Sequence, residues 1–104
     1  LMRIAFLPTT AADFEWITDY YLSVFPEGGP NAYKSFDRAL INLGDHPLSG
    51  KAIARTRYRQ YPVRRTPFCL IYRIEADTIE ILHIWDQRSN PLDLILDDNG
   101  IDNS

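Results

Sequence analysis

His83 is the side chain best suited to acid–base chemistry in this chain. An imidazole titrates near neutral pH, so His83 can serve as a general base or a general acid in a proton transfer. However, His83 shares the alternation of Ile79, Ile81 and Trp85 in an apolar segment. This pattern favours a histidine packed on a β-sheet over a catalytic one.

Cys69 is the only thiol and lies between Phe68 and Leu70. We therefore interpret it as a small buried hydrophobe rather than a nucleophile. His46 is the only other histidine, and no pair of these side chains has the spacing of zinc ligands. Residues 28–30 lack the spacing and the Lys-Ser/Thr pair of a phosphate-binding loop. We expect no metal site and no cofactor.

The strongest signal is a run of basic residues, without a single acid, between Asp45 and Glu75. It contains Lys51, Arg55, Arg57, Arg59, Arg64, Arg65 and Arg73. The other four basic residues of the chain face fourteen acidic ones, so the block carries +7 and the rest of the chain −10. Clustered like charges repel one another, so such a block favours an acidic partner. Nucleic acid and an acidic protein segment both fit.

The first half of the chain has the pattern of one short strand and two helices. Residues 3–7 form an apolar run typical of a strand. Thr10 and Asp13 have the spacing of side chains that cap a helix start. Apolar positions then recur at intervals of three and four, which predicts helices near residues 11–25 and 30–43, each with one buried face. These stripes are Phe14, Ile17, Tyr21 and Val24, then Tyr33, Phe36, Leu40 and Leu43.

The second half changes to an alternating pattern. It predicts strands over residues 52–60, 68–74 and 78–85, the last two joined as a hairpin. Three arginines of the first of these strands share one face at a spacing of about 7 Å: Arg55, Arg57 and Arg59. The predicted order is β-α-α-β-β-β, an α+β fold in which a helical hairpin packs on one face of a mostly antiparallel sheet.

A chain of 104 residues with 45% apolar residues is long enough for one domain with one core. We assign residues 1–91 to this domain. Residues 92–104 form an acidic C-terminal tail with four aspartates and no base, which we expect to be partly disordered. One cysteine forms no internal disulfide, and no apolar stretch approaches the roughly 18 residues of a membrane span. We expect a soluble cytoplasmic protein without membrane contact.

Four segments, in order, resemble motifs of the RelE/ParE toxin superfamily. Residues 11–21 resemble its opening helix, Ala-x-x-Asp-Leu-x-x-Ile with a tyrosine one turn later. Residues 46–50, His-Pro-Leu-Ser-Gly, resemble its Pro-x-x-Gly link. Arg59 with residues 68–74 resembles its Arg…Tyr-x-Ile-x-Tyr-Arg-Val strand, and residues 79–88 resemble its closing strand, which ends near His-x-Arg. The resemblance runs from about Arg3 to Pro91, nearly the whole chain.

The resemblance implies a single toxin domain from a bacterial type II toxin–antitoxin pair, of the kind that stabilises plasmids, with a cognate antitoxin as partner. One branch of this superfamily, the RelE type, cleaves messenger RNA on the ribosome, and the ParE-like branch poisons DNA gyrase. In a ribonuclease, His83 would transfer protons, while Arg65 and Arg88 would stabilise the charged phosphate. However, Cys69 stands where RNA-cleaving relatives carry an arginine, and Asp86 departs from a histidine common in the closing motif.

The catalytic set is therefore incomplete. We favour the ParE-like branch, a toxin that inhibits DNA gyrase by protein binding and without catalysis, and the alternative is a metal-independent, ribosome-dependent endoribonuclease. We expect acidic antitoxin side chains to contact the arginines and the target to contact the end of the last strand. The predicted partner-binding residues are Arg55, Arg57, Arg59, Arg64, Trp85, Gln87 and Arg88. A homodimer and a hetero-oligomer with the antitoxin both remain open.

Overall fold

One short strand and two helices precede the remaining strands of the sheet, as the sequence predicts, but four strands follow the helices where three are predicted. The computed structural model describes residues 2–86, so the predicted tail of residues 92–104 lies outside the described residues. The elements are β1 (Arg3–Phe6), α1 (Thr10–Asp19), a π-helical turn η1 (Tyr20–Val24), a 3-10 turn η2 (Pro26–Gly28), α2 (Gly29–Asp45), β2 (Lys51–Ala52), β3 (Arg59–Pro62), β4 (Phe68–Glu75) and β5 (Thr78–Asp86). No helix among residues 2–86 is long and apolar enough to cross a membrane.

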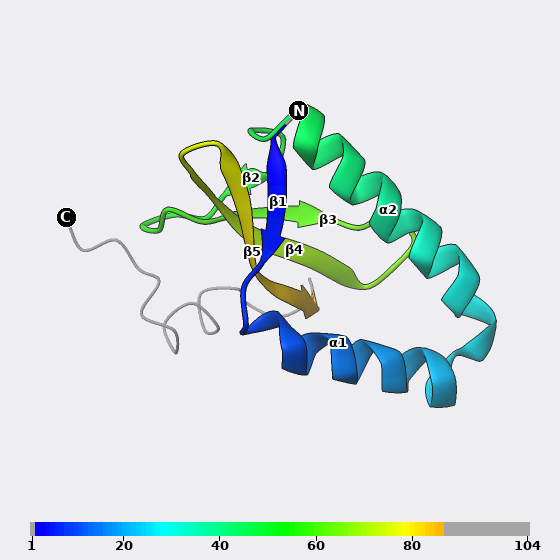
Figure 1. Cartoon of the computed structure of the whole chain (residues 1–104). Coiled ribbons are helices and arrows are strands. Elements are labelled where there is room, and N and C mark those ends of the chain that lie inside the picture. The colour runs from blue at the N-terminus through cyan, green and yellow to red at the C-terminus, as the bar shows by residue number, and fades with distance from the viewer. Residues whose placement is uncertain (1, 87–104) are drawn as a thin grey trace.

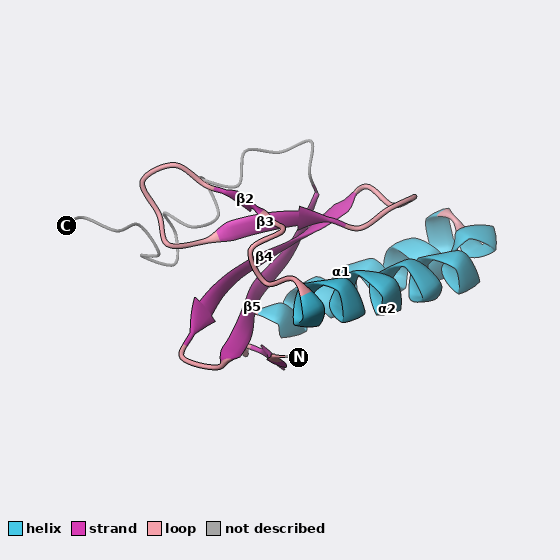
Figure 2. Ribbon diagram, turned by 90° about the horizontal axis from the view of Figure 1, so that it is seen from above, coloured by secondary structure: helices cyan, strands magenta, loops and turns pink. Residues whose placement is uncertain are grey.

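The strands form one mixed sheet in the order β1-β5-β4-β3-β2 (Figure 1). β1 runs parallel to β5, and the other neighbours are antiparallel. Both helices lie on the same side of this sheet (Figure 2). The α+β class and the helical hairpin on one face of a mostly antiparallel sheet are confirmed.

The predicted strand over residues 52–60 is wrong. β2 has only two residues, and no strand continues after Ala52 until β3 begins at Arg59. The intervening turn is closed by the Ile53 N–H, which donates to the Tyr58 carbonyl at 3.0 Å, and Arg55 has a left-handed backbone with φ 66°. Both Ile53 and Tyr58 are buried. Burial of these two side chains favours a compact turn, so the predicted row of three arginines on one strand face does not form.

The main core lies between the helices and the sheet. It gathers Ile17 of α1, Ala39 and Leu43 of α2, and one face of the central strands, including Phe68, Leu70 and Tyr72. A second, smaller cluster covers the other face of β4, where Ile53 and Tyr58 pack on Cys69, Ile71 and Leu82. Both faces of β4 are therefore buried, which explains its continuous apolar run.

The predicted helix cap of Thr10 and Asp13 is also wrong. The Thr10 hydroxyl donates to the Leu7 carbonyl at 2.7 Å, and no side chain caps the start of α1. Asp13 instead accepts the backbone N–H of Ile84 at 3.1 Å. The pairing of β1 with β5 ends at Ile81, so the carboxylate of Asp13 takes the place of a strand partner farther along β5. It thereby ties α1 to the sheet.

Candidate functional site

An apolar groove of about 700 Å³ lies between the two helices and the sheet. Leu70 and Ile84, which face each other on β4 and β5, contribute to its lining from the sheet. The α1 side is lined by Phe14, Ile17, Thr18, Tyr21 and Leu22, and the α2 side by Ala32, Tyr33, Phe36, Asp37 and Leu40. Apart from the hydroxyls of Tyr21 and Tyr33, the polar side chains in these walls are those of Thr18 and Asp37, so the groove suits an apolar ligand rather than a reacting one.

The groove exists because the two predicted stripes are only partly buried. Ile17 and Leu43 reach the core, but Val24 and Tyr33 are 70% and 76% exposed, so the predicted buried face does not extend to these two positions. The ends of the two helices that meet at η2 extend past the strands (Figures 1 and 2). The exposed apolar side chains near these ends, such as Val24 and Tyr33, are available to a partner.

Sequence reasoning missed this groove, although α1 and η1 carry a usable signal. Apolar and aromatic residues occur almost all round this segment, from Phe14 to Phe25. A helix with so little polar face is typically buried or bound. Because Leu22 and Phe25 are 71% and 47% exposed, binding is the better interpretation.

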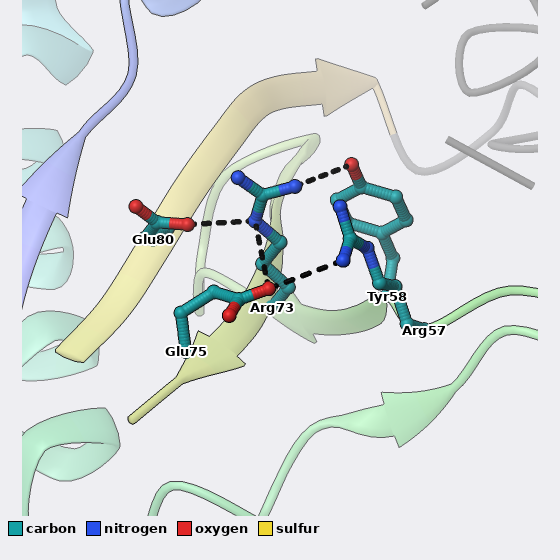
Figure 3. Close-up of polar contacts among 5 residues, drawn as sticks. All are labelled: Arg57, Tyr58, Arg73, Glu75 and Glu80. Atoms are coloured by element: carbon teal, nitrogen blue, oxygen red, sulfur yellow. Dashed lines mark hydrogen bonds and ion pairs between the residues drawn. The ribbon is translucent and has the colours of Figure 1, made fainter. Parts of the chain in front are cut away.

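Arg73 and Arg57 of the basic block are engaged within the fold (Figure 3). Arg73 donates from Nε to Glu80 at 2.7 Å and from Nη1 to the Tyr58 hydroxyl at 3.5 Å. Burial alone would lower the pKa of Arg73, but the hydrogen bonds and charges of Glu80 and Tyr58 outweigh it and raise the pKa. Arg57 pairs with Glu75 at 3.1 Å. The network ties the turn before β3 to the hairpin of β4 and β5.

Arg59 closes the link after α2. Its Nη1 donates to the Gly50 carbonyl at 2.7 Å and to the Leu48 carbonyl at 3.4 Å. Arg55 and Arg64 are exposed, as is Arg65, but they lie in the turns before and after β3. Arg55 therefore lies at the opposite end of β3 from Arg64 and Arg65.

Of the residues named for RNA cleavage, the two that the structure describes, His83 and Arg65, do not form an exposed pair. His83 is 8% exposed, and its Nδ1 lies 2.9 Å from Oδ2 of Asp13. Arg65 lies in the exposed turn between β3 and β4. Trp85 packs on the second cluster, and its buried indole N–H finds no acceptor within the described part of the chain. Gln87 and Arg88 lie outside the described residues.

Cys69 faces Trp85 across β4 and β5 and is 2% exposed. Burial, with a smaller contribution from the charge of Asp86, raises the pKa of its thiol to about 11. Since the thiolate is the reactive form, the native protein should react with iodoacetamide at pH 8 on the order of a hundredfold more slowly than the urea-unfolded chain. Mass spectrometry of timed samples measures both rates. Equal rates would show that Cys69 is accessible and therefore contradict its burial.

Among residues 2–86, no three His, Cys, Asp or Glu side chains gather in a way that could hold a metal ion. The groove is lined mainly by apolar side chains, so it would recognise a ligand by shape and apolar contact. Its walls come from helices that are separated along the chain from the sheet residues beneath them. It can accept the apolar face of a helix or a short run of apolar side chains.

A family model described as the ParE toxin of type II toxin–antitoxin systems, parDE, matches residues 4–91. Among solved structures, a chain of one described as the chromosomal ParDE TA system from P. aeruginosa is similar, with a TM-score of 0.64 and 24% sequence identity. The match covers 80% of this chain and 92% of that chain, and it supports the same fold. No curated protein matches the sequence significantly.

Proposed function

We propose that this chain, which belongs to the family of ParE toxins of type II toxin–antitoxin systems, inhibits DNA gyrase by binding it. We also propose that a cognate antitoxin neutralises it. The observation that carries this proposal is the large apolar groove, together with the burial of the groups that would do chemistry. Such a molecule is equipped to act through protein contacts in the cytoplasm. The RelE-type endoribonuclease is the alternative.

The groove is our candidate for the antitoxin site. Arg57 is engaged with Glu75 and Arg59 with two backbone carbonyls, so both would exchange internal contacts for antitoxin contacts at little net gain. Apolar surface released from water contributes about 25 cal/mol per Å². An amphipathic antitoxin helix in the groove would therefore gain most of its affinity from Leu22, Tyr33 and their neighbours, with the exposed Arg55 guiding its approach.

The buried positions of His83 and Cys69 support the ParE-like branch over the RelE type. A base that activates a 2′-hydroxyl must come within hydrogen-bond reach of it, and His83 is enclosed between β5 and Asp13. Cys69 offers no positive charge to a phosphate. One missing electrostatic donor of this kind can lower a rate by about 10²–10³.

Assays on an induced culture and on purified protein test the proposal. In the induced cells we expect filamentation and DNA-damage signalling, with messenger RNA intact. Purified protein added to gyrase should abolish its supercoiling activity. Primer extension on translated transcripts examines the alternative. Reproducible cuts at codon positions that vanish in His83→Ala would overturn the gyrase proposal and establish the endoribonuclease. Gyrase that still supercoils DNA in the presence of excess toxin would also contradict the gyrase proposal.

A further inference from the structure

We infer that the flank of α1 opposite the groove, together with the turn between β3 and β4, is the surface that contacts the toxin's target. The partner would be a protein segment that presents an apolar side chain beside carboxylates. This inference rests on the proposed function, because it says where on the toxin that target binds. The surface consists of Trp16, Tyr20, Arg64 and Arg65, and we call it the Trp16 surface.

The helical period places two separate surfaces on α1. Successive residues of a helix are rotated by about 100° about its axis. When Ile17 faces the core, the residues before and after it therefore point to opposite flanks of the helix. Phe14 and Tyr21 fall on one flank and line the groove. Trp16 and Tyr20 fall on the other flank and are absent from the groove lining. One helix therefore offers the antitoxin and the target different sides.

The Trp16 ring is exposed but held in place. It is 53% exposed, stacks on Tyr20 with ring centroids 5.9 Å apart, and packs in a T-shaped arrangement with Phe68 at a centroid distance of 5.5 Å and an interplanar angle of 88°. Phe68 itself is fully buried. A large ring fixed by a buried one loses little conformational freedom on binding, and tryptophan is enriched among residues that dominate binding energy.

Phe68 also connects this ring to the two arginines. Its carbonyl accepts the Val63 N–H at 3.0 Å, and its own N–H donates to the Thr66 hydroxyl at 3.1 Å. The turn that carries Arg64 and Arg65 is thus closed on the residue that supports Trp16. Both arginines are exposed, and neither pairs with an acid within residues 2–86. Two exposed cations on a turn that is closed on the residue supporting Trp16 suit a partner with carboxylates.

The surrounding charge favours a protein partner over nucleic acid. Glu15 precedes Trp16 directly, and Asp19 lies three residues after it, where helical side chains are neighbours. Both carboxylates are exposed. They would repel the phosphates of a nucleic acid whose bases stack on Trp16. A folded protein, in contrast, can place one carboxylate opposite the arginines and an apolar side chain on the rings.

Charge reversal at Arg64 tests the inference. We expect Arg64→Glu to weaken binding to purified gyrase at least about tenfold and to relieve growth inhibition, with antitoxin binding unchanged. Arg38→Glu is the matched control, because Arg38 is an exposed arginine on α2 outside both surfaces, and it should retain both activities. Trp16→Ala should reproduce the loss. Thermal melting verifies that each variant is folded.

The outcomes separate this surface from the identity of the target. If the wild-type protein fails to bind gyrase while Arg64→Glu still relieves growth inhibition and Arg38→Glu does not, the surface stands and the gyrase proposal fails. If Arg64→Glu and Trp16→Ala remain fully toxic, the inference is overturned. Binding of a labelled single-stranded oligonucleotide that Arg64→Glu abolishes would also overturn it in favour of a nucleic-acid surface.

Discussion

Replacing Gly50 by alanine is expected to lower the free energy of unfolding by about 3 kcal/mol, one of the largest effects available to a single methyl group in this chain. A Cβ built on Gly50 meets the ring of Tyr72, with Cε1 only 2.6 Å away and the hydroxyl oxygen closer still. Tyr72 is fully buried, so its ring has no free space into which to move. Urea unfolding monitored by circular dichroism gives the change.

Two hydrogen bonds fix the Tyr72 hydroxyl beside Gly50. It donates to the Pro47 carbonyl at 2.7 Å and accepts the Gly50 N–H at 3.0 Å. Through them the link after α2 is attached to the centre of β4, and any shift that admits a methyl group breaks at least one of these bonds. No described glycine has a positive φ, so the effect is one of close approach and not of backbone strain.

Gly29→Ala is the control for this prediction. Gly29 begins α2, and a Cβ built on it has Cβ of Tyr21 as its nearest neighbour at 4.0 Å, an ordinary contact. Alanine should be neutral or stabilising there, because it restricts the unfolded chain and favours helix. If both variants unfold at the same urea concentration as the wild type, the Gly50–Tyr72 contact is less tight than the structure indicates.

The elements with strong periodicity were predictable from the sequence. The predicted helix over residues 11–25 corresponds to α1 with η1, and the predicted hairpin corresponds to β4 and β5. The resemblance to the RelE/ParE superfamily is confirmed by the ParE family match. Each of these depended on local spacing, which a sequence records directly.

The errors came from side chains whose roles are set by distant parts of the chain. Asp13 has the spacing of a helix cap, but the backbone N–H of Ile84 competes for it across the fold. Ile53 and Tyr58 look like strand residues, yet they are buried as the two ends of a turn. A local sequence pattern does not show which of these contacts is more stable, because the free energy of each depends on the backbone groups and apolar surface that the sheet leaves uncovered.

The candidate site was less predictable than the fold. Charge made the arginines conspicuous, but Arg59 and Arg73 are held by internal acceptors that are 9 and 7 residues away along the chain. The groove depends on how far two helices extend past a sheet, which no spacing rule gives. Only the apolar excess of the segment from α1 to Phe25 pointed to it.

Leu22→Asp is expected to weaken antitoxin binding by about a hundredfold or more, because a bound helix would bury an unpaired carboxylate in apolar surroundings. Leu22 lines the groove and is 71% exposed in the free protein. The folded toxin should therefore keep its stability within about 0.5 kcal/mol. Titration calorimetry with the protein encoded by the neighbouring reading frame measures the affinity, and co-expression measures whether the antitoxin still protects the cell.

Ile41→Asp gives the matched comparison, since Ile41 is an aliphatic residue of α2 that is 61% exposed and does not line the groove. It introduces the same charge on the same helical hairpin, so it should leave antitoxin affinity and protection unchanged. A toxin with Leu22→Asp that still inhibits growth but escapes neutralisation would separate the groove from the Trp16 surface. Equal affinity of both variants for the antitoxin would place the antitoxin elsewhere, and Arg55, exposed in the turn before β3, would then be the next residue to reverse in charge.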